Sequence, residues 1–325
     1  MMEFGPLPAF DPLAGTVVLA PEKNEEGYWV GCPGVLHDGE RFWLTYRRRR
    51  PRGAGAERGW RCAVAVSDDG VRFTDVWSVH KDELGTPSME RFCLAPADGG
   101  GFVLYLSYVD PADNRWRIDA LGPAAHPSEF DVASARPVLT AASTGTEGVK
   151  DPYVLRAGPV TYLFASYAEA LDGLGGEAHA SADIYNVGAT THPTGLATSL
   201  DGGASFTWHG QALGVGQGWD RYQARLNSVV PVPGGYVGFY DGSASHEENY
   251  EERCGVAVSG DLFGWRRLSG ERPWVTSPHR GGSVRYLDAL LLEGAVVAVL
   301  RADPRGRRAR AAHDPDPVRV THTRG

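Results

Sequence analysis

The stretch "GVKDPYVLRAGPVTYLFASY" (residues 148–167) contains the pattern on which the fold prediction depends. An apolar segment runs to Ala157, Gly158 and Pro159 interrupt it, and an aromatic-rich segment follows. Short runs of β-branched and aromatic residues separated by Gly or Pro are typical of β-hairpins. We therefore expect two antiparallel strands here.

The same hairpin pattern occurs five times along the chain. The five segments are "GVLHDGERFWLTYRRR" (34–49), "FCLAPADGGGFVLYLSYVD" (92–110), "YVLRAGPVTYLFASYAE" (153–169), "SVVPVPGGYVGFYDG" (228–242) and "RYLDALLLEGAVVAVLRAD" (285–303). We expect their first strands to start near Val35, Phe92, Tyr153, Ser228 and Tyr286. These starts are roughly 55–75 residues apart, and such recurrence indicates a repeat architecture.

A second element follows the hairpin in most repeats. The segments "RCAVAVSDDGVRF" (61–73), "PTGLATSLDGGASF" (193–206) and "RCGVAVSGDLFGW" (253–265) each predict a strand, a Ser-x-Asp turn and a closing aromatic residue. Asp and Ser side chains accept hydrogen bonds from nearby backbone amides in such turns. The second repeat, "RWRIDALGPAAHPSEF" (115–130), keeps the strand and the aromatic residue but lacks the turn.

A hairpin followed by two more strands makes a four-stranded blade, and repeated blades make a propeller. We predict an all-β fold: a five-bladed β-propeller with four antiparallel strands per blade and a pocket at its central channel. The whole chain, residues 1–325, is expected to form this single domain. The N-terminal segment "GTVVLAP" (15–21) is expected to help close the ring.

Composition narrows the function classes. The net charge of −8 argues against a nucleic-acid partner, and the run "RRRR" (47–50) is interpreted as a solvated loop. No apolar stretch approaches the length of a membrane span, and the first residues do not resemble a secretory signal. We expect no membrane partner, and the oligomeric state stays open.

Cysteine and histidine spacing bears on redox state and metals. The four cysteines, Cys32, Cys62, Cys93 and Cys254, are scattered, which favours reduced thiols and a cytoplasmic location. The histidines form no closely spaced pair of the kind that holds a metal, so we expect neither a metal nor another cofactor.

Charged residues cluster where the first strand of each blade is expected to begin. In a propeller these positions converge on one channel mouth. They are Glu90, Arg91, Lys150, Asp151, Arg225 and Arg285. Lys150 is one of only three lysines among 32 lysine and arginine residues, so its ammonium group is a candidate for a specific role.

The triplet Lys150-Asp151-Pro152, placed at the third blade, is similar to the Arg-Asp-Pro or Glu-Asp-Pro of a known group of enzymes. The chain resembles five-bladed propeller glycoside hydrolases of families 43 and 32 and the mannoside phosphorylases of family 130. The resemblance implies that Asp151 orients and tunes other acids, as in the hydrolases, or donates a proton, as in the phosphorylases.

The sequence departs from the hydrolase pattern at two blades. Those hydrolases carry a catalytic aspartate at the first blade, where this chain has "GCPG" (31–34). They carry an acid glutamate at the fourth blade, where this chain has "ARLN" (224–227). Only Asp151 therefore carries over residue for residue.

Glycoside cleavage usually needs two carboxyl groups beside the scissile bond. The candidate catalytic residues are Asp151, Glu90 and Asp220, with Glu147 as a further acid near the mouth. Each has a structural alternative: Asp151 as a blade cap, Glu90 as a buried ion paired with Arg91 or Arg225, and Asp220 as a turn residue.

The candidate substrate-binding residues are charged, polar or aromatic. They are Arg91, Lys150, Arg225, Asn227, Asp241, His246, Arg285, Trp219 and Trp29. Asp241 could instead be a turn residue, and the two tryptophans could instead be packing residues.

The leading hypothesis is a carbohydrate-active enzyme, a glycoside hydrolase or phosphorylase, acting on a small-molecule or oligosaccharide glycoside in the central pocket. The cluster of Arg91, Lys150, Arg225 and Arg285 suits a substrate with an anionic group. A sialidase-like hydrolase is an alternative, because "SLDGGASF" (199–206) fits the Asp-box pattern, although sialidases have six blades. A non-catalytic propeller that binds a glycan or a protein is the alternative from another class.

Overall fold

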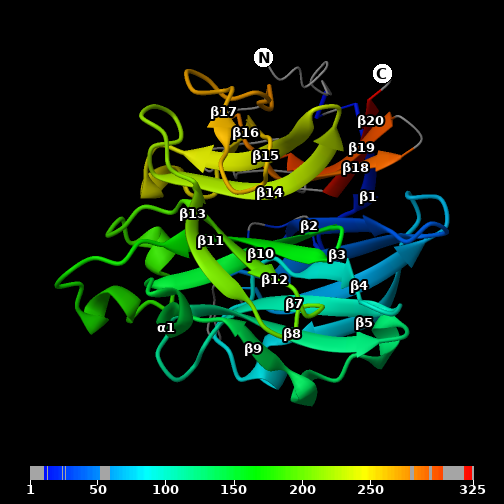
Figure 1. The fold of residues 1–325 in the computed structure, drawn as a ribbon, viewed down its shortest axis with the longest axis horizontal. Coiled ribbons are helices and arrows are strands. Elements are labelled where there is room, and N and C mark those ends of the chain that lie inside the picture. The colour runs from blue at the N-terminus through cyan, green and yellow to red at the C-terminus, as the bar shows by residue number, and fades with distance from the viewer. Residues whose placement is uncertain are drawn as a thin grey trace.

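The computed structural model describes residues 11–323 except 13, 24, 26, 52–58, 279–281, 293–294 and 303–317. It contains five sheets, each of four antiparallel strands (Figure 1). The predicted five-bladed β-propeller is thereby confirmed, and a six-bladed arrangement of the sialidase type is not what the described strands form.

The blades are numbered in chain order. Blade 1 contains β2 (Trp29–His37), β3 (Phe42–Arg49), β4 (Arg61–Ser67) and β5 (Thr74–His80). Blade 2 contains β6 (Cys93–Pro96), β7 (Phe102–Val109), β8 (Trp116–Ala124) and β9 (Arg136–Leu139). Blade 3 contains β10 (Gly148–Ala157), β11 (Val160–Ala168), β12 (Thr194–Ser199) and β13 (Thr207–Leu213).

The last two blades follow the same order. Blade 4 contains β14 (Gln223–Val232), β15 (Gly235–Ser243), β16 (Arg253–Ser259) and β17 (Arg266–Arg267). Blade 5 contains β18 (Val284–Leu292), β19 (Ala295–Ala302), β20 (Val318–Thr323) and, as its outermost strand, β1 (Thr16–Leu19).

Blade 5 joins the two ends of the chain. β1 pairs antiparallel with β20, with Thr16 opposite Val320, and Figure 1 shows blue β1 beside the orange and red strands. The expectation that the N-terminal strand closes the ring is confirmed.

The hydrophobic core lies between neighbouring blades. Five buried clusters join blades 1 and 2, 2 and 3, 3 and 4, 4 and 5, and 5 and 1. The last of these packs Val30, Leu44 and Ala63 of blade 1 with Val320 of blade 5. Each blade is therefore stabilised mainly by burying apolar surface against both neighbours.

The burial of each strand follows its place in the blade. The second strands of blades 1 to 4 are mostly buried because they have a blade on each side, as in "FVLYLSYV" of β7. The outer strand β13 alternates between exposed and less exposed residues, as expected for a strand with one face in water.

The predicted Ser-x-Asp turns are present. The hydroxyl oxygens of Ser67 and Ser199 lie 2.9 Å and 2.7 Å from Oδ1 of Asp69 and Asp201, two residues on. Backbone N–H groups of Arg72 and Ser205 donate to these same carboxylates. The turns are thus held by side chains, as the sequence indicates.

Three of the innermost strands begin five or six residues earlier than predicted. β2, β10 and β14 begin at Trp29, Gly148 and Gln223 rather than near Val35, Tyr153 and Ser228. The strand pairing slips at a bulge in β2, β10, β14 and β18, and each strand continues on both sides of it. Glycine, proline or charged residues interrupt the apolar pattern before each predicted start, as in "VGCPG" (30–34) and "VKDP" (149–152), so the sequence pattern hides the first part of each strand.

The arginine run 47–50 was interpreted as a solvated loop, and this interpretation is wrong. Arg47 and Arg49 lie at the end of β3 and are 4 % and 8 % exposed. The less buried Arg48 lies between them. Such alternation is typical of a strand whose two faces have different surroundings.

In the part of the chain that the structure describes, helical structure is limited to short segments. They are α1 (Ala141–Thr144) and 3-10 helices at Lys81–Leu84, Pro127–Glu129, Val132–Ser134, Gly176–His179, Ile184–Asn186 and His246–Glu248. The connection 169–193 between β11 and β12 is long and has its own apolar cluster, which packs Ile184 and Tyr185 against Trp116. None of the helices in the described ranges has the length and apolarity needed to cross a membrane.

Candidate active site at the channel mouth

The strand register places one residue of each blade at the same position around the channel. These residues are Gly31, Glu90, Lys150, Arg225 and Arg285. Four of the five are charged, which is the convergence expected from the sequence. Their side chains and those of the following residues form one buried polar network, which we call the mouth network.

Asp151 is fully buried, and both its oxygens are occupied. Oδ2 accepts a hydrogen bond of 2.7 Å from Arg225 Nη1, and Oδ1 accepts one of 3.1 Å from the backbone N–H of Arg91. Its φ of 56° is in the left-handed region that residues with a Cβ seldom adopt. This geometry disrupts the strand alternation, so that the Lys150 ammonium lies 3.9 Å from Asp151 Oδ2.

Arg225 connects three carboxylates. Besides Asp151, its guanidinium donates to Asp241 at 2.7 Å and to Glu252 at 3.4 Å. Glu252 also lies 2.6 Å from Arg285 Nε. Burial raises the pKa of Asp241 above its ordinary value, and Arg225 offsets only part of this effect.

Glu90 is the most exposed carboxylate of the network, at 8 %. It lies 2.6 Å from Arg47 Nη1, and Tyr286 Oη donates to it at 3.2 Å. Burial alone would raise its pKa, but Arg47, Lys150 and nearby arginines outweigh burial and hold the pKa well below the usual range. Glu90 is therefore ionised at neutral pH, whereas burial makes the ionised form of Asp241 less favourable than that of a free aspartate.

Lys150 has an aromatic environment. Its ammonium lies 4.1 Å from the ring centre of Tyr185 and 5.0 Å from that of Trp116. Tyr185 in turn stacks on His192, with ring centres 4.2 Å apart. Cation–π attraction to two rings, together with Asp151, stabilises the buried charge.

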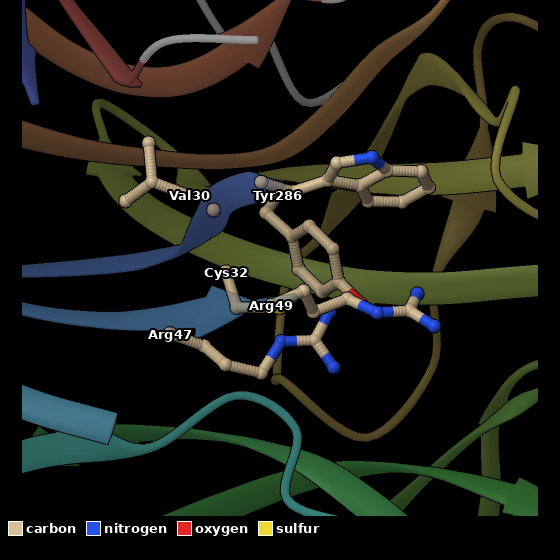
Figure 2. A pocket seen from close by; sticks show the side chains of 7 residues that line it. Val30, Cys32, Arg47, Arg49 and Tyr286 are labelled. Carbon is tan, nitrogen blue, oxygen red and sulfur yellow. The ribbon is translucent and has the colours of Figure 1, made fainter. Parts of the chain in front are cut away.

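A narrow recess adjoins this network (Figure 2), and the side chains that line it leave no room for a water molecule. Its lining residues are Trp29, Val30, Gly31, Cys32, Arg47, Arg49 and Tyr286. Figure 2 shows Arg47 and Arg49 of β3 reaching the same space as Tyr286 of β18. Burial raises the pKa of the Cys32 thiol to about 11, so this sulfur is protonated beside Glu90.

The predicted residues fall into three groups. Glu90, Lys150, Asp151, Arg225, Asp241 and Arg285 belong to the mouth network, and Trp29 lines the recess. Arg91 and Asn227 belong to a connected cluster in which Arg91 donates to the Asn227 carbonyl and to Asp288, both at 2.6 Å.

The third group lies apart from the mouth network. Asp220 is bound by Arg267 at 2.6 Å and by the Tyr240 hydroxyl at 2.9 Å. Trp219 stacks on Tyr240, and its indole N–H donates to the Ser269 carbonyl. His246 is exposed on the connection between β15 and β16, near the ring of Tyr222. These contacts hold Asp220 and Trp219 in place outside the mouth network.

Sequence reasoning missed several members of the site. Arg47 was hidden in the arginine run, Glu252 in the acidic segment "HEENYEER" and Tyr185 in the long connection 169–193. The position of Arg47 directly after the apolar and aromatic run "FWLTY" (42–46) could have placed it in a strand rather than in a loop. No sequence pattern indicates that Glu252, in a loop rich in charge, is fully buried.

Metal binding has no support in the described part of the chain. Within those ranges, no group of three or more His, Cys, Asp or Glu side chains is arranged to hold an ion. The acids of the mouth network are instead neutralised by arginine and lysine.

Comparison with solved structures identifies proteins of the same architecture. A thermostable family-43 glycoside hydrolase is similar over 94 % of this chain and 92 % of its own, with a TM-score of 0.61 and 14 % identity. A family-43 enzyme from Xanthomonas citri is similar over 94 % and 90 %, with a TM-score of 0.60 and 14 % identity. This chain shares the fold of these enzymes.

A phosphorylase has the same fold. The β-1,2-mannobiose phosphorylase from Listeria innocua, in complex with β-1,2-mannobiose, is similar over 93 % of both chains, with a TM-score of 0.62 and 12 % identity. No protein-family model matches this sequence, and no curated protein sequence is significantly similar to it. The resemblance to five-bladed glycoside hydrolases and phosphorylases is therefore confirmed at the level of fold.

Proposed function

We propose that this chain is a carbohydrate-active enzyme that binds a glycoside with one anionic group at the channel mouth and cleaves its glycosidic bond. The observation that carries the proposal is the position of Glu90, an ionised carboxylate among cations and next to Arg47, which lines the narrow recess. Glycosidases pair one ionised carboxyl with one that holds a proton.

In this proposal Glu90 acts as the general base or nucleophile. Burial raises the pKa of Asp241, so this carboxyl takes up a proton more readily than a free aspartate does. Tyr286 connects the two, because its backbone N–H donates to Asp241 and its hydroxyl donates to Glu90. Asp151 orients Arg225 from a position closed to solvent, so we assign it a positioning role.

We assign binding of the glycoside's anionic group to the cations around Glu90. Arg47 lines the recess, and the ion pair of the Lys150 ammonium with Asp151 is long, at 3.9 Å. Across the network, Arg47, Arg49, Lys150, Arg225 and Arg285 face Glu90, Asp151, Asp241 and Glu252. With all four carboxyl groups ionised, the network has an excess of one positive charge, which suits one carboxylate better than a dianion.

A non-catalytic glycan-binding propeller is the second candidate. Asp151, Asp241 and Glu252 are all fully buried and held by arginine, which leaves them closed to a substrate in this conformation. Buried ion pairs of this kind also occur in purely structural networks.

The four buried cysteines without disulfides support a reducing compartment, and we propose the cytoplasm as the location of either activity.

The test is a panel of aryl glycosides, including uronides, assayed with and without inorganic phosphate. Turnover without phosphate supports hydrolysis, and turnover that requires phosphate supports phosphorolysis. Preference for a uronide over the matching neutral glycoside supports the anionic group. Saturable binding of a glycoside with no turnover in either condition would favour the binding propeller instead.

A further inference from the structure

Tyr250 has an unusual backbone conformation beside the mouth. It lies in the connection between β15 and β16 with a φ of 133°, which residues with a Cβ rarely adopt. Such a conformation is strained and persists only where the surroundings enforce it.

Neighbouring contacts enforce this conformation. The Tyr250 N–H donates to Glu252 Oε2 at 2.9 Å, and Glu252 is itself held by Arg285. On the other side, Asn249 Nδ2 donates to the Tyr185 carbonyl at 2.9 Å. The loop is therefore fixed both to the mouth network and to the long connection of blade 3.

The strained residue places its ring against the recess. The Tyr250 ring meets Trp29 edge to face, with centres 5.6 Å apart and an interplanar angle of 82°. Two nearly perpendicular rings, one from blade 1 and one from the loop of blade 4, thus form a corner. Trp29 lines the recess, so this corner lies at its edge.

A guanidinium group lies in this corner. Arg49 is 4.9 Å from the Trp29 ring centre and 5.3 Å from the Tyr250 ring centre, and it also lines the recess. A guanidinium stacks on aromatic faces through a flat, weakly hydrated surface. The C–H face of a pyranose ring is also flat and weakly hydrated, and it stacks on the same kind of ring.

The geometry points to an aromatic sugar subsite formed by Trp29 and Tyr250, which Arg49 fills until a sugar ring displaces it. This inference rests on the proposed function, since it names where one ring of the glycoside binds. It makes Tyr250 a specificity-determining residue. It also makes Arg49 a competitor of the substrate, in contrast to Arg47, which is assigned to the anionic group.

Binding measurements on variants test the subsite. The probes are methyl glycosides of xylose, arabinose, mannose and galacturonic acid, titrated by calorimetry. Arg49→Ala should bind at least one neutral probe about 3- to 10-fold more tightly than the unaltered chain, because no cation–π contact has to be displaced. Arg48→Ala is the matched control, since Arg48 stacks on Tyr46 elsewhere on β3 and should leave affinity unchanged.

Tyr250 is tested with a substitution that suits its backbone. Tyr250→Gly accepts a positive φ and so preserves folding, but it should weaken binding about tenfold. Tyr250→Phe keeps the ring and should bind like the unaltered chain.

The outcomes separate this inference from the proposed function. If glycosides are turned over while Arg49→Ala shows unchanged or weaker binding, or Tyr250→Gly binds as well as the unaltered chain, the subsite is refuted and the enzyme stands. If no probe binds to any variant and no glycoside is turned over, both proposals are refuted.

Discussion

Lys150 shows how one side chain can be selected by its surroundings. Its compact ammonium lies between the faces of Tyr185 and Trp116 and approaches Asp151 at 3.9 Å. A guanidinium is larger and planar, and it would require different spacing from the rings and from the carboxylate. This gives a physical reason for a lysine at this position in a chain rich in arginine.

We expect Lys150→Arg to raise KM for the preferred glycoside about tenfold while the fold is retained, because charge is kept but its position changes. Steady-state kinetics with a melting curve measures this. Lys81→Arg, which alters a lysine of a short 3-10 helix, is the control and should behave like the unaltered chain. Equal KM values for the two variants would remove the functional role of Lys150.

Asp151 carries a buried ion pair whose loss is costly. Asp151→Asn removes one of the negative charges that neutralise Arg225, which is only 1 % exposed. We therefore expect the free energy of unfolding to fall by about 3 kcal/mol or more. Chemical denaturation measures it. Glu22→Gln, which breaks the more exposed pair with Arg50, should cost less than about 1 kcal/mol. A similar small loss in Asp151→Asn would contradict the assigned positioning role.

At the scale of elements, the Ser-x-Asp turn has in the structure the side-chain hydrogen bonds that the sequence predicts. Asp201 accepts hydrogen bonds from the Ser205 hydroxyl and backbone N–H, and these hold its pKa below the ordinary value. A carboxyl whose folded pKa is depressed stabilises the fold above its unfolded pKa of about 3.9. The stabilisation is lost as the pH falls through the folded pKa.

Asp201→Asn should therefore lower the melting temperature by a few degrees at pH 7, because the amide accepts these hydrogen bonds less strongly. The difference from the unaltered chain should shrink as the pH is lowered below about 4. Melting curves across pH 3–7 measure both effects. Asp68→Asn, at the exposed middle position of the blade 1 turn, should change neither, and a pH-independent effect of Asp201→Asn would refute this account.

Hairpins and turns could be predicted from the sequence because their signals are local. The bulges could not, since Gly31, Lys150 and Arg225 resemble loop residues until the neighbouring strand is in place. The same dependence on distant residues limits what the sequence predicts about the candidate site. Asp151, Arg225 and Glu90 were found by their position before predicted strands, whereas Glu252 and Tyr185 reach the mouth only through loop geometry. Asp220 was selected by sequence proximity, but its carboxylate points to Arg267.

At the scale of the whole molecule, the ring is closed by a short strand. β1 contributes the outer strand of blade 5, and the blade 5–blade 1 core packs beside it, with Val18 and Leu19 against that cluster. The five interblade cores form a closed series, so each depends on this closure.

Deleting residues 1–20 should therefore lower the melting temperature on the order of 5 °C or more and broaden the transition. Calorimetry measures this, and Val17→Ser, which alters an exposed side chain of β1, is the control. An unchanged melting temperature after the deletion would show that β1 does not contribute to ring stability.

The central claim is that the mouth is an active site in which Glu90 is the reactive carboxylate. Its most direct test is the turnover of the best aryl glycoside by Glu90→Gln and by the unaltered chain, with melting curves to establish that both are folded. Glutamine keeps the shape of the side chain but cannot act as base or nucleophile, so we predict a fall in kcat of about 10²-fold or more. Equal turnover by the folded variant, or no turnover of any glycoside by the unaltered chain, would contradict the claim.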